Sequence, residues 1–203
     1  MSEDHPIFEE KAWGLNSKQI KLTRLARKLG QEKFSLRAAH YDRTATFPTE
    51  NYKDLFESGL IGVCIPEPSG GHGADFKTYM LTAAEIGRYC GATALTFNMH
   101  VSSCLWSGHL IDTLDIDGAD REKHNVSREI HYKRILNEGA IYAQPFSEGG
   151  SAAAGSSTFQ TIALKVDNGW IVNGKKIFAS LSGHANYYGT LCTEISYFGA
   201  KCS

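Results

Sequence analysis

The stretch KVDNGWIVNGKKIFASLSGHANYYG, residues 165–189, decides the second part of the fold. It contains two Asn-Gly pairs, at 168–169 and 173–174, between short runs in which apolar and polar residues alternate. Asn-Gly between alternating runs predicts a tight hairpin turn, because both residues tolerate positive φ. Together with the alternating run 162–166, the stretch predicts a three-stranded antiparallel meander whose third strand covers 176–179.

The chain before this stretch has helical spacing of its apolar residues. Asn16 or Ser17 can cap the first helix, Gly30 is a weak point within it, and Pro48 separates it from a helix that Thr49 caps. The periodicity predicts helices near residues 17–40, 49–56, 75–86, 95–106 and 127–137. The residues expected in the core of this part are Leu25, Leu29, Leu60, Ile61, Ile86, Leu95 and Trp106.

These patterns predict the α+β fold class, with an all-α N-terminal helical domain followed by an incomplete antiparallel β domain. We expect a tail over residues 1–16, the helical domain over 17–138 and a partial β domain over 139–203. Three strands without a partner sheet are a poor independent unit. The expectation is therefore that the chain is truncated partway through its second domain.

Composition narrows the class of protein. The 203 residues are 42% hydrophobic and 21% charged, as in ordinary soluble domains. No apolar run approaches the roughly 18 residues of a membrane span, and a net charge of −1 gives no general attraction to nucleic acid. The acidic, polar N-terminus is not a signal peptide, and five cysteines without a CxxC pair indicate reduced thiols. We therefore expect a cytoplasmic protein with no nucleic-acid partner and no membrane span.

Residue patterns alone leave the chemistry open. His100, Cys104 and His109 could share a helix face, but no fourth ligand completes a zinc set, which favours a core role and no metal site. The glycine-rich segment 149–157 could bind an anion through its amides or link two domains. Ser147 lies outside any GxSxG motif, and no local triad is present.

Three segments resemble the acyl-CoA dehydrogenase family. LFESGLIGVCIPEPSGGHG, residues 55–73, is similar to the end of a helix and the Gly-Gly-x-Gly turn of that family's N-terminal domain. HYKRILNEGAIYAQP, residues 131–145, resembles its last N-terminal helix and the crossing into the middle β domain. WIVNGKKIFASLSGHANYY, residues 170–188, resembles its strand, Asn-Gly turn and flavin-facing segment. The resemblance extends from about residue 17 to 194.

The resemblance implies an α–β–α flavin enzyme that is a homo-oligomer at full length. Phe178 takes the place of the family's tryptophan beside the isoalloxazine ring, and Ala179 and Ser180 take the places of the next two residues, which face flavin N5. FAD is the implied cofactor and FMN the alternative. The further residues implied as approximate flavin or substrate contacts are Tyr142, Gln144, Ser147 and Ser151.

The departures from the family qualify the implied activity. The family's middle domain opens with Thr-Glu-Pro followed by Gly-x-Gly-Ser-Asp, whereas this chain has AQPFSEGGSAAAGSS at residues 143–157. Pro145 can align with the proline of that motif, or Ser147-Glu148 can align with its Thr-Glu, but both cannot align without a gap. The C-terminal helical domain, which carries the catalytic glutamate in most members, is absent, and Glu148, Asp167 and Glu194 do not match that base. No catalytic residue is therefore assigned.

Three functions follow from this resemblance. The first is a fragment of an acyl-CoA dehydrogenase-like flavoprotein of fatty acid metabolism, inactive as the isolated chain. The second is a flavin-dependent monooxygenase of the same fold, and the third is a non-catalytic remnant. The implied partners are an acyl-CoA or other small-molecule substrate and either an electron-acceptor flavoprotein or a flavin reductase.

Overall fold

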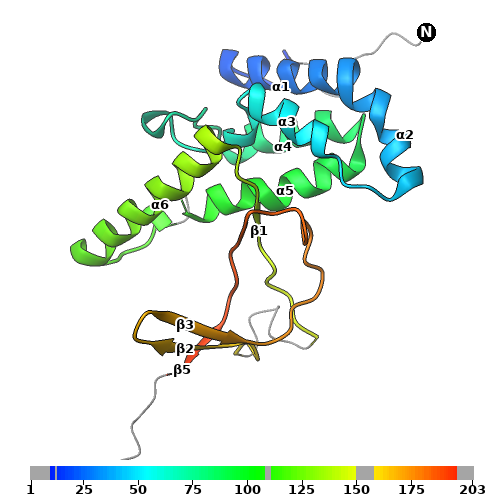
Figure 1. The fold of residues 1–203 in the computed structure, drawn as a ribbon. Helices are drawn as coiled ribbons and strands as arrows, with labels where there is room; N and C mark the ends of the chain where they lie inside the picture. The colour runs from blue at the N-terminus through cyan, green and yellow to red at the C-terminus, as the bar shows by residue number, and fades with distance from the viewer. Residues whose placement is uncertain (1–9, 12, 108–110, 150–157, 196–203) are drawn as a thin grey trace, which may run out of the picture. The chain divides into compact units, whose positions relative to one another are not determined.

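The computed structural model describes residues 10–11, 13–107, 111–149 and 158–195. The chain divides into two units, Met1–Ile141 and Tyr142–Ser203, where the sequence predicts a domain boundary between residues 138 and 139. The first unit is helical and the second carries short strands, so the predicted fold class is confirmed (Figure 1).

The first unit contains helices joined by short turns. Its elements are α1 (Ser17–Leu29), the π-helical turn η1 (Gly30–Phe34), α2 (Ser35–Thr44), α3 (Thr49–Glu57), the 3-10 turns η2 (Leu60–Gly62) and η3 (Glu67–Ser69), α4 (Phe76–Gly87), α5 (Gly91–Leu105) and α6 (Gly118–Glu138). None of the helices in the described ranges combines the length and the apolar composition that crossing a bilayer requires.

Local capping explains where the helices begin and end. Asn16 forms a full capping box with Gln19 at the start of α1, and the Asp75 carboxylate accepts from the Thr78 amide at the start of α4. Gly139, with φ of 67°, ends α6 as predicted. Thr49 is the first helical residue of α3 rather than its cap, because Pro48 occupies the N-cap position.

The start of α6 is a correction to the sequence prediction. The helix begins at Gly118, well before the predicted residue 127. The Asp117 side chain accepts from the Asp120 amide, and the acidic residues that follow are favourable at a helix N-terminus. Helix capping, rather than apolar periodicity, therefore sets this boundary.

The core of the first unit lies between α1, α3, α4, α5 and η2. Leu60, Ile61 and Ile86 are fully buried and Leu29 is nearly so, as predicted. The prediction is wrong for Leu95 and Trp106, which are 58% and 49% exposed, and Leu25 is only partly buried. Helix α5 buries the opposite face instead, which carries Phe97, His100, Val101 and Cys104.

The second unit contains two small sheets. Strands β1 (Tyr142–Ala143) and β4 (Tyr187–Tyr188) pair in parallel, with Tyr142 opposite Tyr187. Strands β2 (Ile162–Val166) and β3 (Gly169–Asn173) form the predicted antiparallel hairpin, and β5 (Thr193–Ile195) completes the order β3-β2-β5.

The predicted third strand of the meander is wrong. Residues 176–179 form no strand, and β5 pairs with β2 in parallel instead. Gly174 does not have the positive φ of a hairpin turn. A β-carbon at Gly174 would lie 2.3 Å from Thr161 Oγ1, so this glycine allows close packing rather than a turn.

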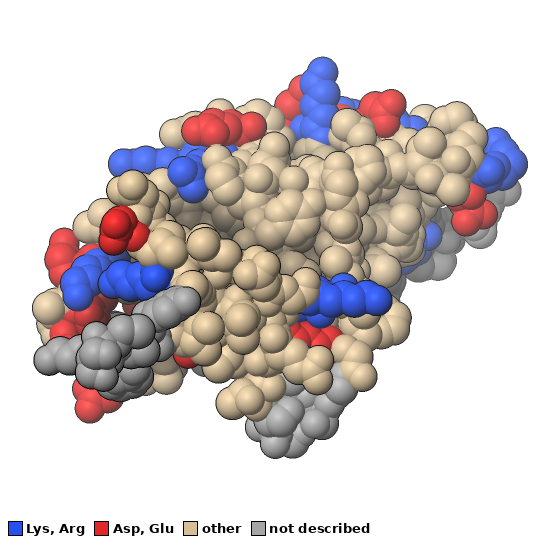
Figure 2. Space-filling model, turned by 60° about the horizontal axis from the view of Figure 1, so that its bottom comes forward, with Lys and Arg blue, Asp and Glu red and all other residues tan. Residues whose placement is uncertain are grey.

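The basic residues of the N-terminal helices are largely paired with carboxylates. On the face shown in Figure 2, Lys and Arg side chains lie beside Asp and Glu side chains. The pairs are Lys18–Glu67, Arg24–Glu10, Arg27–Glu85, Lys33–Asp54 and Arg37–Asp54. Acidic partners therefore neutralise these five cations, and the carboxylates of Glu85 and Asp54, which hold three of them, are buried.

Candidate functional site

Two residues with an unusual backbone conformation frame the segment 178–181. Phe178 has φ of 53° and Leu181 has φ of 71°, a region that side chains other than glycine rarely adopt. Such strain costs about 1–3 kcal/mol per residue and occurs preferentially at ligand-binding sites. The segment is therefore a candidate functional site on backbone geometry alone.

The side chains of these two residues differ in exposure. Phe178 is 87% exposed, whereas Leu181 is 4% exposed. A large aromatic side chain in solvent does not stabilise the folded unit through burial. Leu181 anchors the segment, and Phe178 is free to contact a planar ligand.

The segment also carries polar groups beside Phe178. The Ser180 amide donates to the Phe178 carbonyl over 2.9 Å, and the Ser182 amide donates to the Ala179 carbonyl over 3.0 Å. Within the described ranges no hydrogen-bond partner is recorded for the Ala179 amide or the Ser180 hydroxyl. These two donors directly follow the exposed Phe178 in the chain, which suits a flat ligand with acceptor atoms at its edge.

The other predicted contacts lie in the preceding segment of the same unit. The Ser147 carbonyl accepts from the Ile177 amide over 3.0 Å, so Ser147 lies against the chain just before Phe178. The Tyr142 ring stacks on Tyr187 with centroids 4.9 Å apart. Gln144 follows β1 and is partly exposed, and Ser151 is outside the described residues.

A buried ion pair that sequence reasoning did not assign supports this arrangement. Glu148 Oε1 accepts from Lys176 Nζ over 2.7 Å, and the two side chains are 2% and 9% exposed. The Glu148 carboxylate also accepts from the Gln160 amide at 2.7 Å, the Thr161 amide at 2.9 Å and the Thr161 hydroxyl at 2.6 Å. We call these four residues the Glu148 cluster.

The Glu148 cluster fixes the charge state of its carboxylate. Hydrogen bonds from Lys176 and then from Thr161 lower the pKa of Glu148 to about 2. Glu148 is therefore ionised at neutral pH and its oxygens are occupied by donors. The sequence signal that could have found it is the Ser147-Glu148 alternative in the altered loop, because a buried acid there needs a basic partner.

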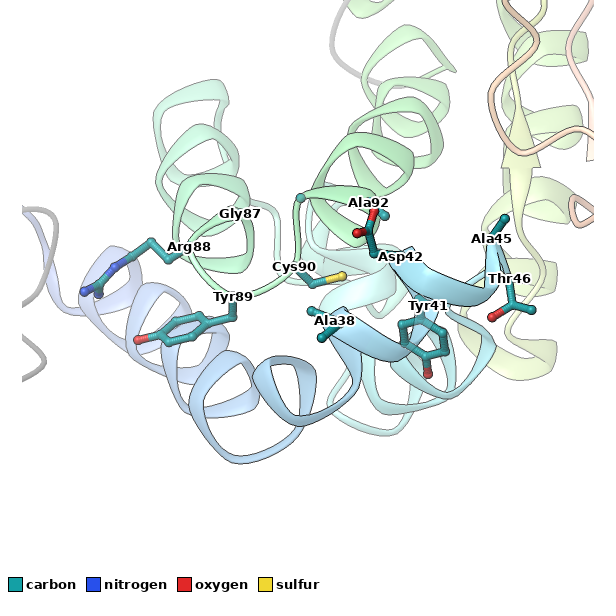
Figure 3. Close-up of a pocket in the computed structure, with 12 residues that line it drawn as sticks. Ala38, Tyr41, Asp42, Ala45, Thr46, Gly87, Arg88, Tyr89, Cys90 and Ala92 are labelled. Atoms are coloured by element: carbon teal, nitrogen blue, oxygen red, sulfur yellow. The ribbon is translucent and has the colours of Figure 1, made fainter. Parts of the chain in front are cut away.

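A separate pocket of about 730 Å³ lies in the helical unit, between α2 and the turn that joins α4 to α5. Figure 3 shows the Cys90 thiol pointing toward α2, while the Arg88 and Tyr89 side chains point the other way. Cys90 is 3% exposed, and its sulfur accepts from the Thr93 hydroxyl over 3.1 Å. None of the predicted flavin contacts lines this pocket.

The histidine and cysteine residues of α5 are part of the core. His100 is fully buried and its Nε2 lies 3.0 Å from the Ile61 carbonyl oxygen. Burial lowers the pKa of His100 to about 4 and raises the pKa of the Cys104 thiol to about 12. His109 is outside the described residues, and within them no group of three or more His, Cys, Asp or Glu side chains could hold a metal ion.

Comparison with known proteins identifies the helical domain. Residues 16–111 match the sequence profile of the acyl-CoA dehydrogenase N-terminal domain. Residues 16–111 are an acyl-CoA dehydrogenase N-terminal domain. The family expected from the sequence is confirmed, and α1 to α5 of this domain are its helices.

Proteins similar to this domain and to the strands after it include dehydrogenases and a monooxygenase. The short-chain specific acyl-CoA dehydrogenase of Clostridium acetobutylicum is 26% identical over 87% of this chain and 43% of its own length. Butyryl-CoA dehydrogenase of Megasphaera elsdenii is 25% identical, with a TM-score of 0.68 over 87% of this chain and 44% of that chain. The FMN-bound dibenzothiophene monooxygenase of Paenibacillus sp. A11-2 is 19% identical, with a TM-score of 0.69 over 86% of this chain and 40% of that chain. The chain thus spans less than half the length of each of these proteins.

The residues present around Phe178 fit a flavin ring. An exposed aromatic ring offers one flat contact, and the Ala179 amide and Ser180 hydroxyl, which have no hydrogen-bond partner among the described residues, offer two donors. A flavin has a planar ring with acceptor nitrogen and oxygen atoms on its edge, and these groups match both features.

Proposed function

We propose that this chain supplies the N-terminal domain and part of the flavin site of an acyl-CoA dehydrogenase-like oxidoreductase. Phe178 would lie against the flavin ring, and Ala179 and Ser180 would face its N5 edge. Tyr142, Gln144, Ser147 and Ser151 would be further contacts of the flavin or the substrate. When bound, the flavin would supply the hydride acceptor for oxidation of an acyl-CoA thioester.

The observation that carries the proposal is the conformation of Phe178. Its ring is 87% exposed and its φ is 53°, so the residue is neither buried for stability nor relaxed in its backbone. Backbone strain is found preferentially at ligand-binding sites, and an exposed ring offers contact area to a planar ligand, so both features support the proposal.

Ser180 has the more specific role in the proposal. A hydroxyl that donates to the flavin stabilises negative charge as the ring accepts electrons. Phe178 contributes contact area and excludes water from that side of the ring.

The described carboxylates of the second unit are not suited to act as the general base. Glu148 is buried and its pKa is lowered by the hydrogen bonds from Lys176 and Thr161, which makes its carboxylate a weak base. Asp167 lies in the turn between β2 and β3, and Glu194 lies in β5. We propose that the isolated chain is inactive as a dehydrogenase and that the active protein includes a base from elsewhere.

The proposal extends to partners and location. The full protein would be a homo-oligomer that acts on an acyl-CoA or another small molecule and passes electrons to an acceptor flavoprotein. The cysteines Cys64, Cys90, Cys104 and Cys192 are free thiols, which fits a reducing compartment such as the cytoplasm.

Flavin titration tests the proposal. The quenching of FAD fluorescence by the purified chain should give saturable binding, and Ser180→Ala should weaken it by about tenfold, as expected for a hydrogen bond to a charged group. Phe178→Ala should weaken binding through lost contact area. The matched control is Ser182→Ala, since Ser182 is exposed and follows the segment. Equal affinity of all four proteins, or no saturable binding at all, would exclude this site.

The same titration with FMN separates the two flavin functions. Preference for FAD favours a dehydrogenase, whereas preference for FMN favours a monooxygenase that uses reduced flavin delivered by a reductase. Binding of neither flavin would leave the non-catalytic alternative.

A further inference from the structure

We infer that Glu148 and Lys176 are positioning residues that hold the segment 177–181 in its ligand-binding conformation. This inference rests on the proposed function, because it assigns a role toward the flavin to two residues that would not touch it. The geometry that leads to it is the convergence of three separate stretches of chain on one buried ion pair.

Lys176 is held from several directions. Its ammonium group donates to Glu148 at 2.7 Å and to the Phe146 carbonyl at 3.3 Å, and it lies 4.3 Å from the centre of the Phe159 ring. A desolvated ammonium with a carboxylate, a carbonyl and an aromatic face around it has little freedom to move. The lysine thus joins the segment 146–148 to the chain that enters Phe178.

Glu148 joins the third stretch. Its carboxylate accepts from the backbone amides of Gln160 and Thr161 just before β2, and Thr161 packs in turn against Gly174. The segments 146–148, 159–161 and 174–177 therefore meet at one carboxylate. Removing either charge would leave the other buried and unpaired, which is strongly unfavourable.

The cluster lies directly before the strained residue. Lys176 is followed by Ile177, whose amide donates to the Ser147 carbonyl over 3.0 Å, and then by Phe178 with its positive φ. At the other end, the buried Leu181 carbonyl accepts from the His184 and Ala185 amides. A strained conformation persists only when the surrounding structure over-determines it. The ion pair fixes one flank and Leu181 fixes the other.

The test replaces Lys176 and its neighbour separately. Lys176→Met keeps the length of the side chain and removes the charge, and Lys175→Met is the matched control because Lys175 is exposed and adjacent. Backbone hydrogen exchange at Ile177, exchange across β2 and β3, and the dissociation constant for FAD are measured for each variant.

We expect Lys176→Met to speed exchange at Ile177 and to raise the dissociation constant for FAD, each by about tenfold or more, with β2 and β3 protected as before. Lys176→Arg should show exchange at Ile177 and a dissociation constant close to those of the unsubstituted chain, because it keeps the positive charge opposite Glu148. If Lys176→Met matches Lys175→Met in both measurements, the positioning role is wrong.

Two other outcomes are also decisive. If Lys176→Met also speeds hydrogen exchange in β2 and β3, the deciding variant is Glu148→Asp, which keeps the negative charge. Faster exchange at Ile177 alone in Glu148→Asp supports the positioning role. Faster exchange throughout the unit overturns it. If the unsubstituted chain binds no flavin, the proposed function fails, while the exchange at Ile177 still decides whether the ion pair holds the segment.

Discussion

At the scale of single residues, two glycines are explained by close packing rather than by backbone angles. Gly30 has φ of −57°, and Gly174 likewise lacks a positive φ. A β-carbon at Gly30 would lie 2.1 Å from Cδ2 of the Tyr89 ring. Gly30 therefore lets the π-helical turn approach the end of α4.

Gly30→Ala should destabilise the helical unit. The added methyl group overlaps the Tyr89 ring, and overpacking of this kind costs about 1–3 kcal/mol of unfolding free energy. Denaturant unfolding measures the effect, and Gly118→Ala is the control because nothing lies within 4 Å of its β-carbon position. In a Tyr89→Ala background the penalty should largely vanish; a penalty that stays the same would mean that the ring is not its cause.

His100 makes the helical unit sensitive to acid. Its pKa is lowered by burial to about 4 in the folded state, whereas an unfolded histidine titrates near 6.5. The folded state therefore binds the proton less readily than the unfolded state does. The contribution of neutral His100 to the unfolding free energy is complete above pH 6.5 and is lost as the pH falls toward 4, by about 3 kcal/mol in total.

Denaturant unfolding between pH 7.5 and 4 measures this loss. Burial also lowers the pKa of His131 to about 4, so His131 adds to the effect in the same direction. His131→Gln should flatten part of the profile, whereas the exposed His184 should leave it unchanged when replaced by Gln. Unfolding free energy that does not change over this range would contradict the burial of neutral imidazoles.

At the scale of elements, α5 is apolar on both sides. Its sequence GATALTFNMHVSSCL contains no Asp, Glu, Lys or Arg, so charge does not mark which side faces the core. The spacing of Leu95 and Trp106 predicts a core stripe, but the side with Phe97 and Val101 is the one buried against the rest of the unit.

Substitutions on the two sides of α5 should therefore differ in cost. Phe97→Ala should lower the unfolding free energy by about 3–5 kcal/mol, because Phe97 is fully buried. Trp106→Ala should cost about 1 kcal/mol or less, because the side chain is half exposed. Thermal or denaturant unfolding compares them, and a larger cost for Trp106→Ala would reverse the assignment of faces.

Local signals in the sequence predicted most element boundaries. The cap Asn16, the helix end at Gly139 and the hairpin of β2 and β3 depend on residues close in the chain. Contacts between distant residues were not predicted: β5 pairs with β2, and Lys176 pairs with Glu148. Period and propensity carry no information on which distant partner a strand or a charge will find.

The same limit applies to the candidate site. Phe178, Ala179 and Ser180 were assigned through resemblance, and their role in flavin binding stays a prediction. The strain at Phe178 could not be expected from its residue type, because phenylalanine strongly disfavours positive φ. It arises from constraints on both sides of the segment.

At the scale of the whole molecule, the two units differ in how much apolar surface they bury. The first unit has a continuous core, whereas β3 is exposed along its length. Adjacent residues of a strand point to opposite faces, so the half-exposed Trp170 and Ile171 show that both faces of this sheet contact solvent.

The sheet should therefore open more readily than the helices. Native-state hydrogen exchange should be at least about tenfold faster in β2 and β3 than in α4 and α5, since few buried contacts resist local opening. The Glu148 cluster should be a local exception at Thr161, whose amide donates to a buried carboxylate. Equal protection from exchange in both units would contradict this prediction, because it would mean that the strands are shielded although their side chains are exposed.

Turnover is the remaining whole-molecule prediction. Anaerobic mixing of the flavin-loaded chain with acyl-CoA thioesters should not bleach the oxidised flavin band at an enzymatic rate, because a positioned base contributes roughly 10²–10⁴-fold. Rapid bleaching would show that Glu148, Asp167, Glu194 or another carboxylate of the chain acts as a base. Glu148→Gln would then distinguish Glu148 from the others.

The parallel pairing of β5 with β2 also has a kinetic consequence during synthesis. The helices of the first unit form from contacts near in sequence, so they can fold while later residues are still being added. Strand β2 must instead wait for Thr193–Ile195 to emerge before its second edge is paired. Between these events the β2–β3 hairpin has an open edge on the nascent chain, and slower elongation over residues 174–192 would prolong the time in which another chain could pair with it.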